Sequence, residues 1–156
     1  MTKMTHELSL NIEPKHFKTV LVGVDESEQG YVALANAIHQ ANEDNAKLVI
    51  ASILELGDLS TFDAMSIPVI RDKEAKLQIN LDRYKEYAIS KGVVKVETIV
   101  GNGSKAGSVL VQDLIPETNA DLIIIGAHSK DGFLDYLGSQ AVYVARNAKI
   151  SSMIAR

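Results

Sequence analysis

The most informative absence in this chain of 156 residues is cysteine, which does not occur at all. Without thiols, the protein has neither a disulfide framework nor a thiolate metal site. No apolar run approaches the roughly 18 residues that a membrane-spanning helix needs. Residues 1–17 also lack the continuous apolar segment of a signal peptide. We therefore expect a cytoplasmic protein that makes no contact with a membrane.

Basic residues are fewer than acidic ones, with 16 Lys and Arg against 20 Asp and Glu and a net charge of −4. Proteins that bind duplex nucleic acid usually carry a strongly basic face, so we expect no nucleic-acid partner. The histidines lie far apart in the sequence and lack the spacing of metal ligands. They are His6, His16, His39 and His128. The sequence therefore predicts no metal site.

Several catalytic and cofactor motifs are missing. The chain contains neither the phosphate-binding pattern G-x-x-x-x-G-K-[ST] nor a serine in a G-x-S-x-G elbow. Residues 101–106 do match G-x-G-x-x-A, the form of a dinucleotide fingerprint. In that motif an acidic residue ends the next strand, whereas here Asp121 begins it. Asp121 is thus expected at the wrong edge of the sheet, which argues against a dehydrogenase.

Five short apolar runs rich in β-branched residues alternate with segments of helical periodicity. The predicted strands are Thr19–Val24, Leu48–Leu54, Val93–Val100, Leu122–Ile125 and Ser151–Ala155. Such alternation predicts an α/β fold, in which a five-stranded open parallel sheet carries helices on both faces. The length suggests one domain, over residues 17–156, preceded by a flexible N-terminal extension at 1–16.

The stretch Ala120–Ala141 is the best candidate for a binding site. A buried strand ends at Gly126, a polar loop follows, and Gly138 and Ser139 open an apolar helix, with Ser139 able to cap free N–H groups. A strand, a glycine loop and a helix N-terminus form a natural anion site. The alternative is an ordinary strand-to-helix turn, since glycines are common in such turns.

Other polar residues follow the predicted strands at the same edge, where open α/β sheets bind their ligands. Asp25 comes directly after the first strand. It can bind a ribose hydroxyl or magnesium, or serve as a carboxylate at a helix start. In the candidate loop, His128 can act as a general acid or base or make a backbone contact. Lys130 can neutralise phosphate charge, whereas Asp131 and Asp135 would repel phosphate unless a metal ion bridges them.

From about Phe17 onward, the chain resembles the universal stress protein family. The matching segments are Thr19–Glu28, Leu48–Glu55, Val100–Ser104, Asp121–Ser129 and Leu137–Ala148. The resemblance implies a Rossmann-like fold of the adenine-nucleotide alpha-hydrolase type, and usually a homodimer. Some members of the family bind ATP through a pattern G-x2-G-x9-G-[ST], and others lack the pattern and bind none.

Carried onto this sequence, the family pattern places Asp25 near the ribose and the backbone of Ile53 against adenine. Gly126 matches the first glycine, and Ser129 stands where the second belongs. Eight residues rather than nine separate Ser129 from the final pair, Gly138 and Ser139. The nucleotide-binding residues implied are Asp25, Ile53, Gly126, Ala127, His128, Ser129, Lys130, Gly138, Ser139 and Gln140.

The resulting functional hypothesis is a stress-response regulator that binds ATP or a related adenine nucleotide, with or without Mg²⁺. Efficient turnover is not expected, because no nucleophile, base and orienting group stand together in the sequence. One alternative is a nucleotide-free dimeric interaction module of the same family. Another is a weak nucleotide hydrolase that uses Asp25 and His128.

The final strand predicts how the chain assembles. Ser151–Ala155 contains neither proline nor charge, and an exposed edge strand of this kind invites pairing with another chain. The family resemblance points the same way. We expect a twofold homodimer in which Ser152, Met153 and Ile154 meet their copies in antiparallel order. The alternative is a monomer whose edge is covered by the N-terminal extension.

Overall fold

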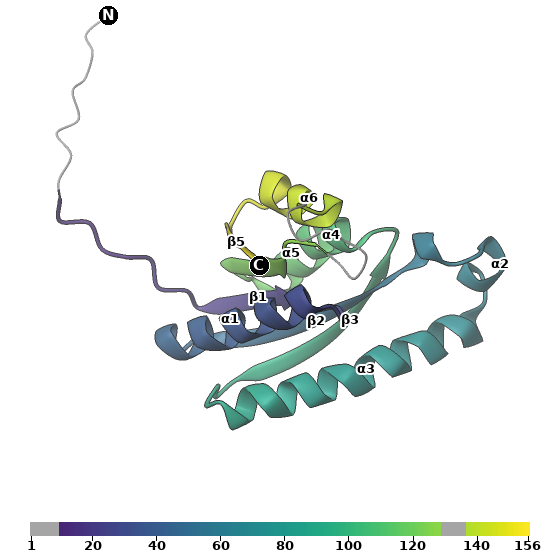
Figure 1. Cartoon of the computed structure of the whole chain (residues 1–156), viewed down its shortest axis with the longest axis horizontal. Helices are drawn as coiled ribbons and strands as arrows, with labels where there is room; N and C mark the ends of the chain where they lie inside the picture. Colours follow the sequence, from purple (N-terminus) through teal and green to yellow (C-terminus); the bar gives the residue numbers. More distant parts are fainter. Residues whose placement is uncertain (1–9, 129–136) are drawn as a thin grey trace, which may run out of the picture.

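The structure is a computed structural model and describes residues 10–128 and 137–156 (Figure 1). Its centre is a five-stranded sheet in the order β3-β2-β1-β4-β5, with every neighbouring pair parallel. The strands are β1 Thr19–Gly23, β2 Lys47–Glu55, β3 Val96–Gly103, β4 Leu122–Gly126 and β5 Ser151–Ala155. The order reverses between β1 and β4, and the predicted open parallel α/β fold is confirmed.

Helices cover both faces of the sheet, as Figure 1 shows. On one face lie α1 Glu28–Asp44 and the long helix α3 Ile67–Ser90. The short elements η1 Leu56–Asp58 and α2 Thr61–Ala64 connect β2 to α3. The other face carries α4 Ala106–Ser108, the π-helical turn η2 Val109–Leu114, α5 Ile115–Thr118, and α6 Ser139–Asn147. Within the described residues, no helix combines the length and apolar content needed to cross a bilayer.

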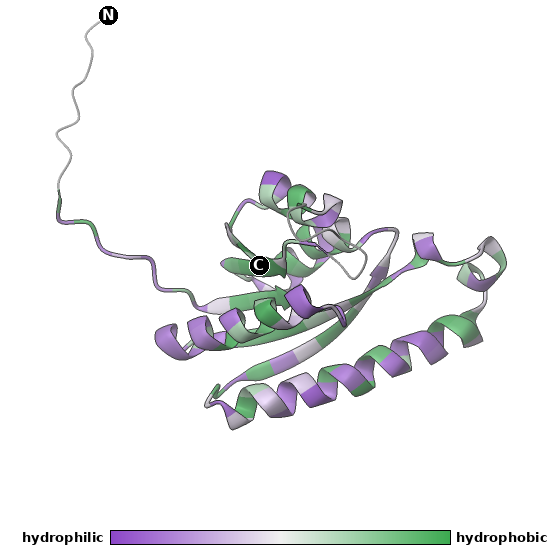
Figure 2. Cartoon of the chain, viewed as in Figure 1, coloured by the Kyte–Doolittle hydropathy of each residue, from purple (hydrophilic) through white to green (hydrophobic). Residues whose placement is uncertain are grey.

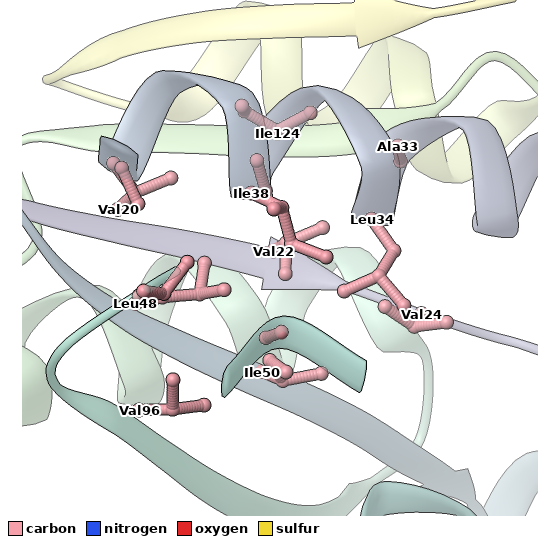
Figure 3. Packing of buried hydrophobic residues seen from close by; sticks show 14 of the residues in the cluster. Val20, Val22, Val24, Ala33, Leu34, Ile38, Leu48, Ile50, Val96 and Ile124 are labelled. Carbon is pink, nitrogen blue, oxygen red and sulfur yellow. The ribbon is translucent and has the colours of Figure 1, made fainter. Parts of the chain in front are cut away.

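Each face of the sheet has its own apolar core. Strand residues alternate between the two cores because successive side chains point to opposite faces. Val20, Val22 and Ile124 pack with Leu34 and Ile38 of α1 on one face (Figure 3). Leu21, Val49 and Ile123 pack against the helices of the other face. The central strands are therefore apolar on both sides, while α3 shows a mixed, largely hydrophilic surface (Figure 2).

Two boundaries differ from the sequence-based predictions, and packing explains both. Gly101–Gly103 continues β3 beside β2 instead of forming a turn. A Cβ on Gly103 would lie 2.5 Å from Val109 Cγ2, so glycine lets η2 sit directly on the strand. Pro116 falls inside the helical run rather than ending it, and the widened turn η2 precedes it. This fits a proline ring that displaces the carbonyl one turn earlier.

The amino edge of the sheet is held by main-chain contacts to carboxylates. Asp121 accepts hydrogen bonds from the N–H groups of Lys18 and Thr19, each at 2.9 Å. Asp44 accepts from Phe17 N–H at 3.0 Å, and this bond is the main reason why the pKa of Asp44 is lowered. Asp121 therefore lies at the edge opposite the carboxyl ends of the strands, as predicted. Residues 10–16 are exposed and form no helix or strand, and the proposed domain boundary at residue 17 stays a prediction.

Candidate functional site

A cavity of about 490 Å³ opens at the carboxyl edge of the sheet, beside the point where the strand order reverses. Its size is within the range of small-molecule sites. The wall combines the ends of β1, β2 and β4, the first turn of α1, the middle of α3, and the starts of α4 and α6. The predicted residues Asp25, Ile53, Gly126, His128, Gly138, Ser139 and Gln140 all line it.

Asp25 is fixed in a tight turn between β1 and α1. Its carboxylate accepts hydrogen bonds from the N–H of Ser27 at 3.1 Å and from the Ser27 hydroxyl. Ser27 in turn caps α1 by accepting from Gly30 N–H at 3.0 Å. A Cβ on Gly30 would lie 2.4 Å from Asp25 Oδ1, so only glycine permits this turn. Asp25 thus makes the predicted helix-start contact while it also lies on the cavity wall.

We expect the substitution Ser27→Ala to lower the free energy of unfolding by about 1 kcal/mol, because it removes the side-chain cap of α1. Urea unfolding followed by circular dichroism measures this change. Ser66→Ala is the matched control, since Ser66 is the N-cap residue of α3 but makes no side-chain capping bond. Equal losses in the two variants would show that the cap at Ser27 contributes nothing of its own.

The end of β2 presents main-chain groups to the cavity. The N–H and C=O of one residue in a parallel strand point to the same side, and successive residues alternate. Ala51 C=O accepts from Val24 N–H at 2.8 Å, so Ala51 faces β1. Ile53, two residues later, must face the same side. Because β1 ends at Gly23, the polar backbone groups of Ile53 point past the end of that strand.

The start of the loop after β4 is tightly anchored. Ala127 N–H donates to Ala155 O at 2.8 Å, and Gly138 N–H donates to Ala127 O at 2.7 Å. His128 N–H donates to the side chain of Gln29 at 3.2 Å. These bonds bring both ends of the loop together beside the first turn of α1. The predicted residues Ser129 and Lys130 lie outside the described residues.

Helix α6 begins differently from the sequence-based prediction. Gly138 is its N-cap residue, with extended backbone angles, and no side chain caps the helix. Ser139 is the first helical residue, so the expectation that it caps the helix is wrong. The N–H groups of the first turn of a helix have no partner within the helix. Here they remain at the cavity wall without a side-chain acceptor.

The start of α4 is in the opposite condition. Ala106 N–H donates to the Glu55 carboxylate at 3.0 Å, and Gly107 N–H donates to Gln140 Oε1 at 2.7 Å. Lys105 pairs with Asp58 at 3.1 Å, and this contact raises the pKa of Lys105. The predicted binding residue Gln140 therefore joins α6 to α4, at the rim of the cavity.

Sequence analysis missed several residues of the wall. Gln29 is buried and holds His128, while Asn80 and Tyr84 come from α3. Burial, together with a hydrogen bond to Tyr31 and the nearby carboxylates, raises the pKa of Tyr84 above its usual range. No local signal marks these residues, because they reach the cavity only through the packing of α1 and α3 on the sheet. Among the described residues, no group of three or more potential ligands is arranged to hold a metal ion.

Nearly the whole chain matches known proteins. Residues 16–156 match the family described as the Universal stress protein family. A putative universal stress protein of Staphylococcus aureus strain USA300 is 28% identical over 141 residues, covering 90% of this chain and 84% of that protein. The universal stress protein UspA from Lactobacillus plantarum has a TM-score of 0.81 at 18% identity, covering 92% of this chain and 100% of that chain. A universal stress protein in complex with cAMP has a TM-score of 0.66 at 25% identity, covering 91% and 98%.

Proposed function

Because the chain belongs to the universal stress protein family, we propose that it binds ATP or a related adenine nucleotide. In this proposal the protein is a homodimeric stress-response regulator of the cytoplasm that does not turn the nucleotide over efficiently. The observation that carries the proposal is the cavity at the carboxyl edge. The backbone of Ile53 points to it from one side, and the uncapped start of α6 borders it on another.

These two features suit the two ends of a nucleotide. A main-chain N–H and C=O pair offers one donor and one acceptor, which complement the ring nitrogen and amino group of adenine. A helix start without a cap favours negative charge and suits a phosphate. Asp25 lies on the wall with them, where a carboxylate can accept from a ribose hydroxyl. The related protein whose structure contains cAMP supports an adenine nucleotide as the ligand.

Slow turnover follows from the partners of the candidate catalytic groups. The Asp25 carboxylate accepts from the N–H and hydroxyl of Ser27, which lowers its capacity to take a proton from water. The main chain of His128 is held by Gln29. We expect phosphate release from ATP to remain near the rate in buffer alone, as measured with a colorimetric phosphate assay. Release at the rate of an ordinary enzyme, lost in His128→Ala, would favour the hydrolase alternative.

We expect Asp25→Ala to weaken ATP binding by about tenfold, the effect of losing one hydrogen bond to a charged group. Binding of inorganic triphosphate should change little, because triphosphate has no ribose. Calorimetry with both ligands makes the comparison, and Asp82→Ala on the exposed side of α3 serves as the control. An equal loss for both ligands would indicate a metal-binding role for Asp25 instead.

The competing candidate is a dimeric interaction module whose cavity holds no nucleotide. It is favoured by the serine at position 129, where nucleotide-binding relatives would have a glycine according to the pattern described above. Heat release of any co-purified ligand, followed by chromatography, separates the two candidates. A purified protein that carries no adenine nucleotide and binds none at millimolar concentration would support the interaction module.

A further inference from the structure

The cavity wall has an unusual charge for a nucleotide site. Four carboxylates, those of Asp25, Glu26, Glu55 and Asp58, line it. Among the described residues of the wall there is no lysine or arginine. Lys105 stands next to the wall, but its ammonium group pairs with Asp58. The described part of the wall is therefore negative, like the phosphates that it would receive.

Helix starts are the remaining source of positive potential, and three of them border the cavity (Figure 1). The protein's own oxygen atoms already engage two. Asp25 and Ser27 accept from N–H groups at the start of α1. Glu55 and Gln140 accept from the two N–H groups at the start of α4. The start of α6 has no side-chain cap, and its dipole is equivalent to about half a positive charge.

One such helix start suits one phosphate group rather than three. A cyclic phosphodiester carries one negative charge, whereas a triphosphate carries about four at neutral pH. Each further phosphate adds negative charge beside the wall carboxylates, and like charges placed together oppose binding. We infer that this cavity selects adenine nucleotides of low charge, a cyclic or simple monophosphate, over the free triphosphate. The inference rests on the proposed adenine-nucleotide function and names the ligand class within it.

Calorimetry with cyclic AMP, AMP, ADP and ATP tests the inference directly, first without divalent cations. We expect the affinity to fall along this series, with ATP at least about tenfold weaker than cyclic AMP. The gap should narrow when Mg²⁺ neutralises the triphosphate and when KCl screens the carboxylates.

Two double variants separate wall charge from total charge. Glu55→Gln with Asp58→Asn removes two negative charges from the wall, and it should raise ATP affinity several-fold more than cyclic AMP affinity. Glu117→Gln with Asp113→Asn makes the same charge change at exposed positions outside the cavity wall, and should preserve the ranking.

The outcomes distinguish the two proposals. Binding of all four nucleotides with free ATP as tight as cyclic AMP overturns the ranking and leaves adenine-nucleotide binding standing. A ranking that the wall variant does not alter, relative to the control, also overturns the role of the carboxylates. Failure of all four nucleotides to bind overturns the adenine-nucleotide function, and the ranking with it.

Discussion

Replacing Gly126 by alanine is expected to lower the free energy of unfolding by about 2 kcal/mol, the usual effect of overpacking. Gly126 ends β4 where the strand meets the first turn of α1. A Cβ at this position would lie 2.9 Å from both the carbonyl carbon and the oxygen of Gln29. These are main-chain atoms of a helix, so they cannot rotate away. The strand end and the helix start must separate to accept the methyl group.

The same movement should impair the site. Gln29 holds the N–H of His128, so displacing this part of α1 also shifts the start of the loop after β4. We expect nucleotide affinity to fall together with stability. Urea unfolding measures the first effect and calorimetry the second.

Gly23→Ala is the matched control, because Gly23 ends the neighbouring strand β1 and also lines the cavity. Its added Cβ would lie 3.1 Å from Leu110 Cδ1, the tip of a side chain that can change rotamer. Replacing glycine also reduces the entropy of the unfolded chain, so we expect a change in stability of less than about 1 kcal/mol. Similar losses in the two variants would show that contact with the main chain of α1 is not decisive.

These glycines illustrate how far the sequence alone leads. Apolar runs bounded by turn residues predict the strands, because a strand buried on both faces needs continuous apolar residues. Ser139–Asn147 and Ser151–Ala155 are found at their predicted boundaries. A glycine, however, looks the same whether it forms a turn or admits a neighbouring side chain. Gly101–Gly103 is of the second kind, and the sequence does not reveal Val109 above it.

The candidate site divides in the same way. Asp25, Gly126 and Gly138 follow or precede regular elements, so topology alone brings them to one edge of the sheet. The wall carboxylate Glu55 acquires its place from contacts with Ala106. Gln29 acquires its place from contacts with His128, 99 residues away in sequence. Residues whose position depends on such long-range packing leave no periodic or local pattern to read.

The predicted homodimer depends on which backbone groups β5 turns outward. β5 is an edge strand of the sheet and pairs with β4 alone. Ala155 C=O accepts from Ala127 N–H, so Ala155 faces β4. By alternation Met153 faces β4 as well, whereas Ser152 and Ile154 point their N–H and C=O groups away from the sheet. An antiparallel partner strand would therefore pair with Ser152 and Ile154. This distinction refines the expectation from sequence, which treated the three central residues alike.

Ser152→Pro should convert the dimer into a folded monomer at micromolar concentration, because proline removes an outward donor and leaves the bonds to β4 intact. The Ser152 side chain is exposed, so the substitution disturbs no core packing. Light scattering measures the mass, and circular dichroism measures the fold. Met153→Pro is the contrasting variant, since it removes a donor to β4 and should lower the free energy of unfolding itself by about 3 kcal/mol. A parent protein that is monomeric at this concentration, or a dimer that persists unchanged in Ser152→Pro, would place the assembly of this protein elsewhere than at β5.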